Sequence, residues 1–187
     1  MLADIVLFKE EGFDLGYDAV IVTRLRKLKE ARGKMQDLVI VEARDAEEAR
    51  KAAENKNVDV MLGIESSSHR DKTHFRDSGL NQTTCALCKA NNIAIAIPVA
   101  EIINSARRSE LLGRIMQNIR LCRKYNVRVI AASFAKNKHE QRTPSDIASF
   151  LRALGMTPKE AMAALNATDE LLRDKRETVR KGVRVKE

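Results

Sequence analysis

The stretch from Asn92 to Ser133 decides the fold, because two apolar runs flank a segment with helical periodicity. The runs are Asn92-Ile93-Ala94-Ile95-Ala96-Ile97-Pro98 and Val127-Arg128-Val129-Ile130-Ala131-Ala132-Ser133. Between them, apolar residues recur every three or four positions and share one helical face; these are Leu112, Ile115, Ile119 and Cys122. Asn104 or Ser105 is the expected helix cap. The pattern predicts a strand–helix–strand unit with parallel strands.

Working outward, strands and helices alternate along most of the chain. Apolar runs predict strands at Asp18–Thr23, Asp37–Glu42 and Val58–Gly63, while Asp4–Phe8 fits either a strand or a helix end. Alternation of this kind indicates a parallel sheet, either closed or open. Because a full eight-unit barrel needs about 250 residues, we expect an α/β fold that is a small or incomplete TIM-like (β/α) barrel of mainly parallel strands with surrounding helices. A doubly wound sheet is the alternative.

Capping residues predict where several helices begin. Asp45 with Glu48 fits a capping box, and Thr143 and Thr157 each precede a proline that suits the first helical position. Weak helical character extends over Arg24–Lys34. We expect one α/β barrel-like domain over residues 1–176, followed by a short charged tail over residues 177–187.

The charge balance favours a polyanionic partner. The chain of 187 residues carries a net charge of +8, although residues 173–187 hold seven Lys/Arg against three Asp/Glu and so supply half of it. Aromatic residues make up 4%, so base stacking is not expected as a main device. An odd number of cysteines, three, without a secretion signal predicts a cytoplasmic protein, and no apolar run reaches the length of a membrane span.

Polar residues gather after the strand at Val58–Gly63. His69, Asp71, His74 and Asp77 are close in sequence there, and their nitrogen and oxygen atoms suit a divalent metal. A solvated polar loop explains them more simply, so no metal ligand is assigned. The chain has no Walker loop, no GxGxxG after a strand and no GxSxG elbow, so no catalytic residue is assigned either.

Basic residues follow the predicted strand ends, where barrels and open sheets place their functional loops. Lys136, Lys138 and Arg142 come after the strand ending at Ser133, and Arg107 and Arg108 open the long helix. Arginine at a helix N-terminus opposes the helix dipole, which hints at a phosphate ligand, although a solvated surface explains it equally well. The polar loop adds three further candidates for RNA binding, balanced by acidic neighbours, namely Arg70, Lys72 and Arg76.

Several short segments, in order and spacing, resemble the ribonuclease P protein component 3 family of archaea, whose eukaryotic relative is the thirty-kilodalton subunit of that enzyme. They lie between Val58 and Met156 and include Val58-Asp59-Val60-Met61, Asn92–Ile97 before Pro98, Arg107-Arg108-Ser109-Glu110-Leu111-Leu112, Lys124-Tyr125-Asn126-Val127, Ala132-Ser133-Phe134-Ala135, Arg142-Thr143-Pro144-Ser145-Asp146-Ile147 and Leu154-Gly155-Met156. The resemblance covers a little over half of the chain. The start is short for the family, which argues against complete barrel closure.

The resemblance implies a barrel-like fold and a non-catalytic role. In that family the protein supports a catalytic RNA, which uses Mg²⁺ to hydrolyse the phosphodiester bond that releases the 5′ leader of precursor tRNA. The protein binds no cofactor itself, pairs with ribonuclease P protein component 2, and meets precursor tRNA indirectly. Backbone phosphate binding by shape and charge is the expected mode.

Two other functions stay open. The first is a metal-dependent phosphoesterase of barrel fold using His69, Asp71, His74 and Asp77. Such barrels carry a His-x-His pair after an early strand, and this sequence has none. The second is a small-molecule enzyme built on a doubly wound sheet.

Overall fold

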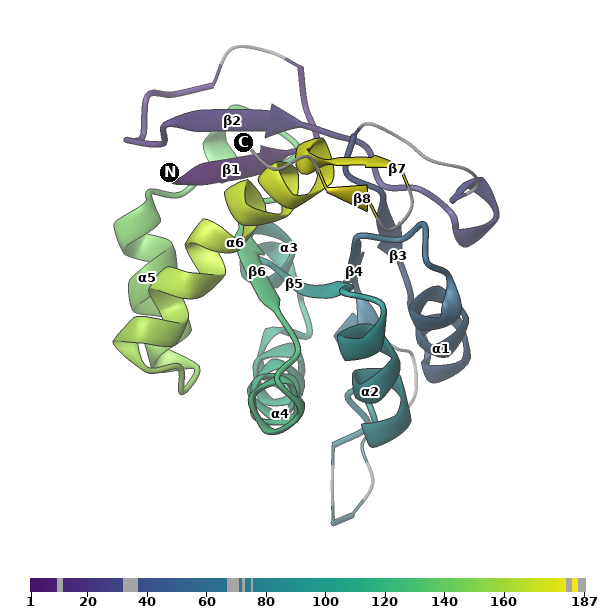
Figure 1. Ribbon diagram of the computed structural model, residues 1–187. Coiled ribbons are helices and arrows are strands. Elements are labelled where there is room, and N and C mark those ends of the chain that lie inside the picture. Colours follow the sequence, from purple (N-terminus) through teal and green to yellow (C-terminus); the bar gives the residue numbers. More distant parts are fainter. Residues whose placement is uncertain are drawn as a thin grey trace.

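The computed structural model describes residues 1–9, 12–31, 37–66, 71, 73–74, 76–180 and 183–184, with side chains as far as residue 175. Its six parallel strands are β1 (Ala3–Val6), β2 (Ala19–Val22), β3 (Ile40–Glu42), β4 (Val60–Leu62), β5 (Ala94–Pro98) and β6 (Val129–Ala132). Its α-helices are α1 (Ala46–Glu54), α2 (Gln82–Ala90), α3 (Val99–Asn104), α4 (Arg108–Tyr125), α5 (Pro144–Ala153) and α6 (Pro158–Glu177). Near the C-terminus, β7 (Thr178–Arg180) and β8 (Val183–Arg184) pair antiparallel (Figure 1).

The strands form a small, loosely closed barrel. One parallel sheet has the order β3-β4-β5-β6, and β1 and β2 form a second parallel pair. Single parallel bridges join the two sheets on both sides, between Val6 and Ala135 and between Arg26 and Val41. The strands therefore follow one another around the ring in chain order. The predicted barrel-like α/β fold is confirmed, and the doubly wound alternative is wrong because that topology requires the strand order to reverse.

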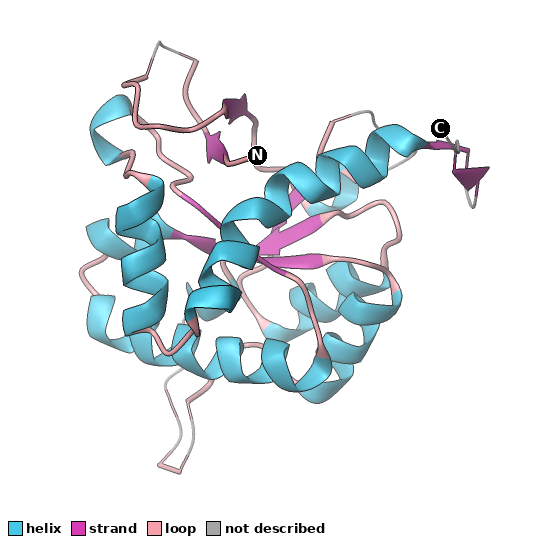
Figure 2. Cartoon of the chain, turned by 60° about the vertical axis from the view of Figure 1, so that its left-hand side comes forward, coloured by secondary structure: helices cyan, strands magenta, loops and turns pink. Residues whose placement is uncertain are grey.

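Successive side chains along each strand point alternately into the barrel and out toward the helices, so the core has an inner and an outer layer. Inside the ring, Ile40, Val60 and Ile130 pack in one cluster with Leu171 of α6. Outside it, Met61 packs under α1 and α2 in a second cluster, and a third cluster packs the far ends of β5 and β6 against α4 and α5. Figures 1 and 2 show the helices around the strands and α6 crossing them.

Helix α6 closes the end of the barrel where the strands begin. Lys175 donates to the carbonyl oxygen of Asp37 at 2.5 Å and pairs with the carboxylate of Asp59, just before β4. Arg128, just before β6, pairs with Asp174 at 3.3 Å. Asp174 and Lys175 thus hold the end of α6 across the amino ends of the strands. The loops that follow the strands lie at the other end of the barrel, where the strands finish.

Local signals in the sequence located most helix starts. The side chains of Asp45, Thr143 and Thr157 each accept a hydrogen bond from the backbone amide three residues later, which confirms all three predicted caps. In the capping box, Glu48 accepts its return bond from the amide of Arg44. The predicted division into a domain over residues 1–176 and a tail stays a prediction.

Two expectations about helices need correction. The helix expected over Arg24–Lys34 is wrong, because Arg26 is extended enough to bridge β3 and only the 3₁₀ turn Leu28–Glu30 is helical among the residues described there. The long helix begins at Arg108, later than expected, because the separate helix α3 occupies Val99–Asn104. None of the helices in the described part of the chain combines the length and apolarity needed to cross a bilayer.

Candidate nucleic-acid interface

The predicted basic residues lie in loops that follow the strands, and the structure divides them into two groups. Lys136, Lys138 and Arg142 follow β6, and Lys138 and Arg142 contact the segment after β1. Arg76, Arg107 and Arg108 lie beside the first half of α4. Arg70 and Lys72 lie outside the described residues.

Hydrogen bonds within the loop after β6, residues 136–142, hold its backbone in place. The carboxylate of Glu140 accepts from the backbone amide of Lys136 at 2.8 Å and from the side chain of Asn137 at 2.9 Å. The guanidinium of Arg142 donates to the carbonyl oxygens of His139 and Gln141 at 3.0 and 2.7 Å. The loop therefore has a fixed backbone path while the side chain of Lys136 is exposed to solvent.

A segment distant in sequence holds this loop against the barrel. The hydroxyl of Tyr17 donates to the carbonyl oxygen of Arg142 at 3.0 Å. Gly12 lies so close to the side chain of Gln141 that a Cβ atom there would clash with its amide oxygen. The segment 12–17 and the loop 136–142 therefore form one surface, which the sequence did not predict.

Asp4 anchors the base of that surface. Its buried carboxylate accepts from the backbone amide of Ser133 at 2.8 Å, from the Ser133 hydroxyl, and from the side chain of Gln141 at 3.4 Å. Burial raises the pKa of Asp4, and these hydrogen bonds oppose the rise. Asp4 thereby ties β1 to the end of β6 at the seam of the barrel.

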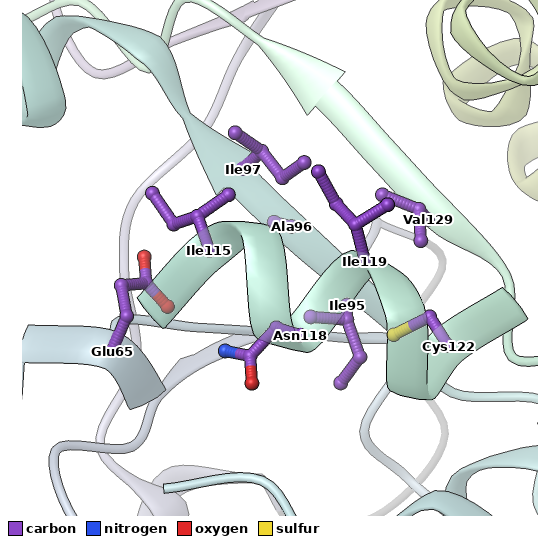
Figure 3. A pocket seen from close by; sticks show the side chains of 9 residues that line it. All are labelled: Glu65, Ile95, Ala96, Ile97, Ile115, Asn118, Ile119, Cys122 and Val129. Carbon is purple, nitrogen blue, oxygen red and sulfur yellow. The ribbon is translucent and has the colours of Figure 1, made fainter. Parts of the chain in front are cut away.

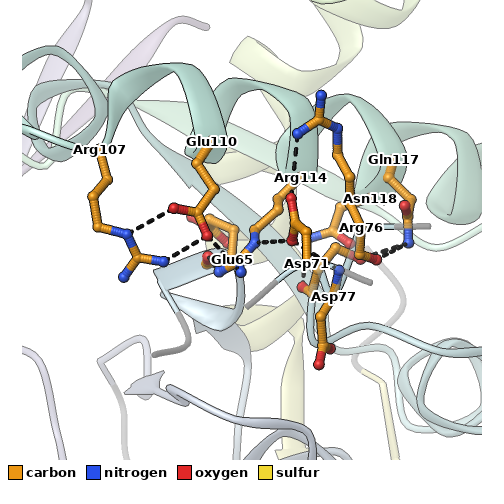
Figure 4. A network of polar contacts seen from close by, with 10 residues as sticks. Glu65, Asp71, Arg76, Asp77, Arg107, Glu110, Arg114, Gln117 and Asn118 are labelled. Carbon is orange, nitrogen blue, oxygen red and sulfur yellow. Dashed lines mark hydrogen bonds and ion pairs between the residues drawn. The ribbon is translucent and has the colours of Figure 1, made fainter. Parts of the chain in front are cut away.

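The second group surrounds a buried arginine on α4 (Figure 4). Arg114 is 0% exposed, and its guanidinium contacts Asp71 at 2.8 Å, Glu110 at 2.6 Å and the carbonyl oxygen of Glu65 at 2.9 Å. Arg114 lies off the apolar face of α4 and is nevertheless buried, because Glu65 and Asp71 of the segment after β4 cover this side of the helix.

The exposed arginines of this group are already engaged with acidic neighbours. Arg107 pairs with Glu110 at 2.6 Å, Arg76 pairs with Asp71 at 3.3 Å, and Arg108 donates to the carbonyl oxygen of Ile103. Burial acts to raise the pKa of Asp71, but Arg114 and the other donors outweigh it and hold the pKa below its usual range. The arginines around Arg114 are thus largely neutralised by neighbouring carboxylates, whereas the loop after β6 has fewer acidic partners.

The described residues give the metal-site hypothesis little support. The carboxylate of Asp71 is occupied by Arg114 and by the backbone amide of Asp77, at 2.8 and 3.0 Å. Within the described ranges, no three His, Cys, Asp or Glu side chains come together in a way that would hold a metal ion. His74 lies within those ranges, and His69, another of the four predicted candidates, lies outside them.

A small cavity lies between β5, β6 and α4 (Figure 3). Its volume is about 10 Å³, close to the lower limit for one water molecule. Glu65 and Asn118 are its polar lining residues among apolar ones, and the side-chain oxygen of Asn118 has no hydrogen-bond partner. Burial raises the pKa of Glu65 to about 7, and the charge of Glu101 adds to the rise. The cavity is too small for a substrate.

A larger hollow of about 380 Å³ lies at the opposite end of the barrel, where β5 and β6 begin. Lys89, Arg123, Arg128 and Glu160 line it. Arg123 pairs with Glu160 at 2.6 Å, and Arg128 pairs with Asp174. Since both arginines are paired within the chain, the loop after β6 remains the stronger candidate for a polyanion.

The chain is similar in sequence to curated proteins of archaea. The chain is 28% identical over 187 residues to ribonuclease P protein component 3 of Methanosarcina acetivorans, covering 95% of this chain and 75% of that protein. It is 28% identical over 137 residues to the protein of the same name from Methanothermobacter thermautotrophicus, covering 72% of this chain and 53% of that one. The chain thus spans between about half and three quarters of the length of these relatives.

The fold also matches a solved assembly. A chain in the cryo-EM structure of archaeal ribonuclease P with mature tRNA superposes with a TM-score of 0.70 at 19% identity, covering 99% of this chain and 88% of that one. Residues 20–180 match the family described as RNase P subunit p30. Because that match extends over most of the barrel and through α6, the chain belongs to the RNase P subunit p30 family.

Proposed function

We propose that this chain is a protein subunit of ribonuclease P that supports the catalytic RNA in removing 5′ leaders from precursor tRNA. Membership of the RNase P subunit p30 family carries the proposal. The fold shared with a chain of archaeal ribonuclease P supports it. On this account the chain belongs to an endoribonuclease only as a subunit, and it contributes binding and positioning while the RNA performs the hydrolysis.

The loop after β6 is the proposed RNA contact. Lys136 and Lys138 are carried by a loop whose backbone is held by Glu140 and Tyr17, and the guanidinium of Arg142 bonds to carbonyl oxygens of that loop. Cations on a fixed backbone suit phosphates at fixed spacing, which is how a protein recognises RNA by shape and charge. The second proposed contact set surrounds the start of α4 and comprises Arg76, Arg107 and Arg108, with Arg70 and Lys72 as further candidates.

The proposed assembly includes more than the RNA. Ribonuclease P protein component 2 is the expected protein partner, and precursor tRNA is met indirectly through the RNA. Mg²⁺ would be used by the RNA and not held by this chain. The three cysteines are free and buried, which supports the expected reducing, cytoplasmic setting.

Co-purification from native cells tests the proposal. A tagged copy of the chain, expressed at its normal level, should recover ribonuclease P RNA and ribonuclease P protein component 2 together. The recovered material should remove the 5′ leader of a precursor tRNA in the presence of Mg²⁺. Recovery of the folded chain without that RNA, at several salt concentrations, would contradict the proposal.

A further inference from the structure

Phe13 is the only exposed aromatic residue among those that the structure describes. Its side chain is 49% exposed, whereas Phe8 and Phe134 are buried and Phe150 is half-buried. An aromatic ring left in water forgoes a large burial energy, so its position calls for an explanation. It lies in the segment after β1 that packs against the loop after β6.

The ring lies beside one cation and one imidazole ring of that loop. The Nζ atom of Lys138 lies 5.6 Å from the centroid of the Phe13 ring, within cation–π range. The ring of His139 meets it edge-on, with centroids 5.8 Å apart and an interplanar angle of 62°. Phe13 is thus oriented by two neighbours and still half open to solvent.

The backbone on either side of Phe13 is held by contacts with the loop after β6. Gly12 lies against Gln141 on one side of Phe13, and Tyr17 bonds to the backbone of Arg142 on the other. The nearby carboxylate of Glu140 accepts from Lys136 and Asn137, and that of Asp14 accepts from the amide of Gly16 at 3.2 Å. These two carboxylates are therefore already engaged by backbone and amide donors.

We propose that Phe13, with Lys138 and His139, is a stacking site for one unpaired nucleobase of an RNA whose backbone phosphates contact the loop after β6. An exposed ring beside cations matches the arrangement by which proteins bind single-stranded nucleic acid, where each stacked base is sequence-tolerant. The proposal rests on the RNA-binding function proposed above and adds a requirement for an unpaired base. One ring holds one base, so the low aromatic content is no obstacle.

The absence of tryptophan in the chain provides a direct test. In a Phe13→Trp variant the indole is the only strong fluorophore, and stacking on a base should quench it. We expect quenching by a short oligoadenylate and none by inorganic polyphosphate, which carries charge without bases. The matched control is Met162→Trp, at an exposed apolar position on α6, whose fluorescence should not respond to either probe.

Affinity measurements give a second readout. Phe13→Leu keeps an apolar side chain without the aromatic face and should weaken oligoadenylate binding about fivefold or more, whereas Phe13→Tyr should retain it. Binding of a fully paired RNA duplex should be the same for both variants. Circular dichroism and unfolding midpoints equal to those of the original chain would show that the variants fold.

The results separate this inference from the proposed function. If oligoadenylate fails to quench the Phe13→Trp variant and Phe13→Leu binds normally, while Lys136→Ala still weakens RNA binding, the stacking site is wrong and the RNA-binding role stands. Weakening of a protein partner's binding by Phe13→Leu, without any effect on RNA, would also overturn the stacking site. If RNA does not bind the chain or its assembled complex at all, both proposals fail.

Discussion

The guanidinium of Arg114 is fully buried on α4 and lies 2.8 Å from the carboxylate of Asp71, 43 residues earlier in the chain. Asp71 in turn accepts from the backbone amide of Asp77 and pairs with Arg76. Through this contact α4 holds Asp71 and, with it, Arg76 and Asp77. A buried arginine that loses its partners destabilises the folded state. The pairing of Arg114 with Asp71 therefore stabilises the packing of Asp71 against α4.

Replacing Arg114 with Met should lower the free energy of unfolding by about 3 kcal/mol, because Asp71 and Glu110 lose their shared cation. The measurement is urea unfolding followed by circular dichroism. The control is Arg76→Met, which removes an exposed ion pair with the same Asp71 and should cost less than about 1 kcal/mol. Equal effects of the two substitutions would show that burial of Arg114 contributes little.

The loop after β6 should govern the salt dependence of RNA binding. Lys136→Ala and Arg142→Ala should each lower the slope of log affinity against log salt by up to about one unit, because one phosphate contact is lost. Affinities measured over a range of salt concentrations give the slope. Arg152→Ala and Lys159→Ala, exposed positions on α5 and α6, are the matched controls. A similar reduction of the slope in all four variants would mean that binding follows net charge without a defined site.

Glu65 should make the protein less stable as the pH rises toward neutrality. Its pKa is raised to about 7 in the folded chain, so the unfolded chain releases the proton first as the pH rises. The resulting stabilisation is complete below about pH 4.5 and is lost as the pH passes through about 7.

The Glu65→Gln variant isolates this effect, because other titrating groups such as Asp4 remain in both proteins. The difference in unfolding free energy between variant and original chain should change by about 3 kcal/mol between pH 5 and pH 8. Urea titrations at several pH values measure it. A difference that is constant with pH would show that Glu65 titrates normally.

The histidines of the polar segment after β4 are not needed for activity if the chain is non-catalytic. Replacing His69 and His74 together with Ala should leave the activity of assembled ribonuclease P largely intact, because neither is expected to act on the substrate. The isolated chain should show no nuclease activity with Mg²⁺, Mn²⁺ or Zn²⁺. A hundredfold or greater loss in the double variant, roughly 2.7 kcal/mol of barrier, would favour the phosphoesterase alternative.

Local patterns in the sequence predicted the strands, most helices and the caps at Asp45, Thr143 and Thr157. These features depend on residues close in the chain, whose periodicity and hydrogen-bonding groups are visible without a structure. Membership of the family, now supported over residues 20–180, was also visible from short segments in order.

Features that depend on distant contacts were not predicted. Arg114 is buried only because the segment after β4 folds over it, and Tyr17 meets Arg142 across 125 positions of sequence. The single bridges that close the barrel at Val6 and Arg26 leave no periodic signal. The exposure of Phe13 likewise follows from tertiary packing, since an isolated aromatic residue in a sequence usually indicates core.

The most direct test of the account is reconstitution of ribonuclease P from its RNA and proteins, with and without this chain. The rate of 5′-leader removal from precursor tRNA would be measured at limiting Mg²⁺, where support for RNA folding matters most. We predict that adding the chain together with ribonuclease P protein component 2 raises the rate, while the chain without the RNA cleaves nothing. Cleavage by the chain alone, or an unchanged rate when the folded chain joins the assembly, would contradict the account.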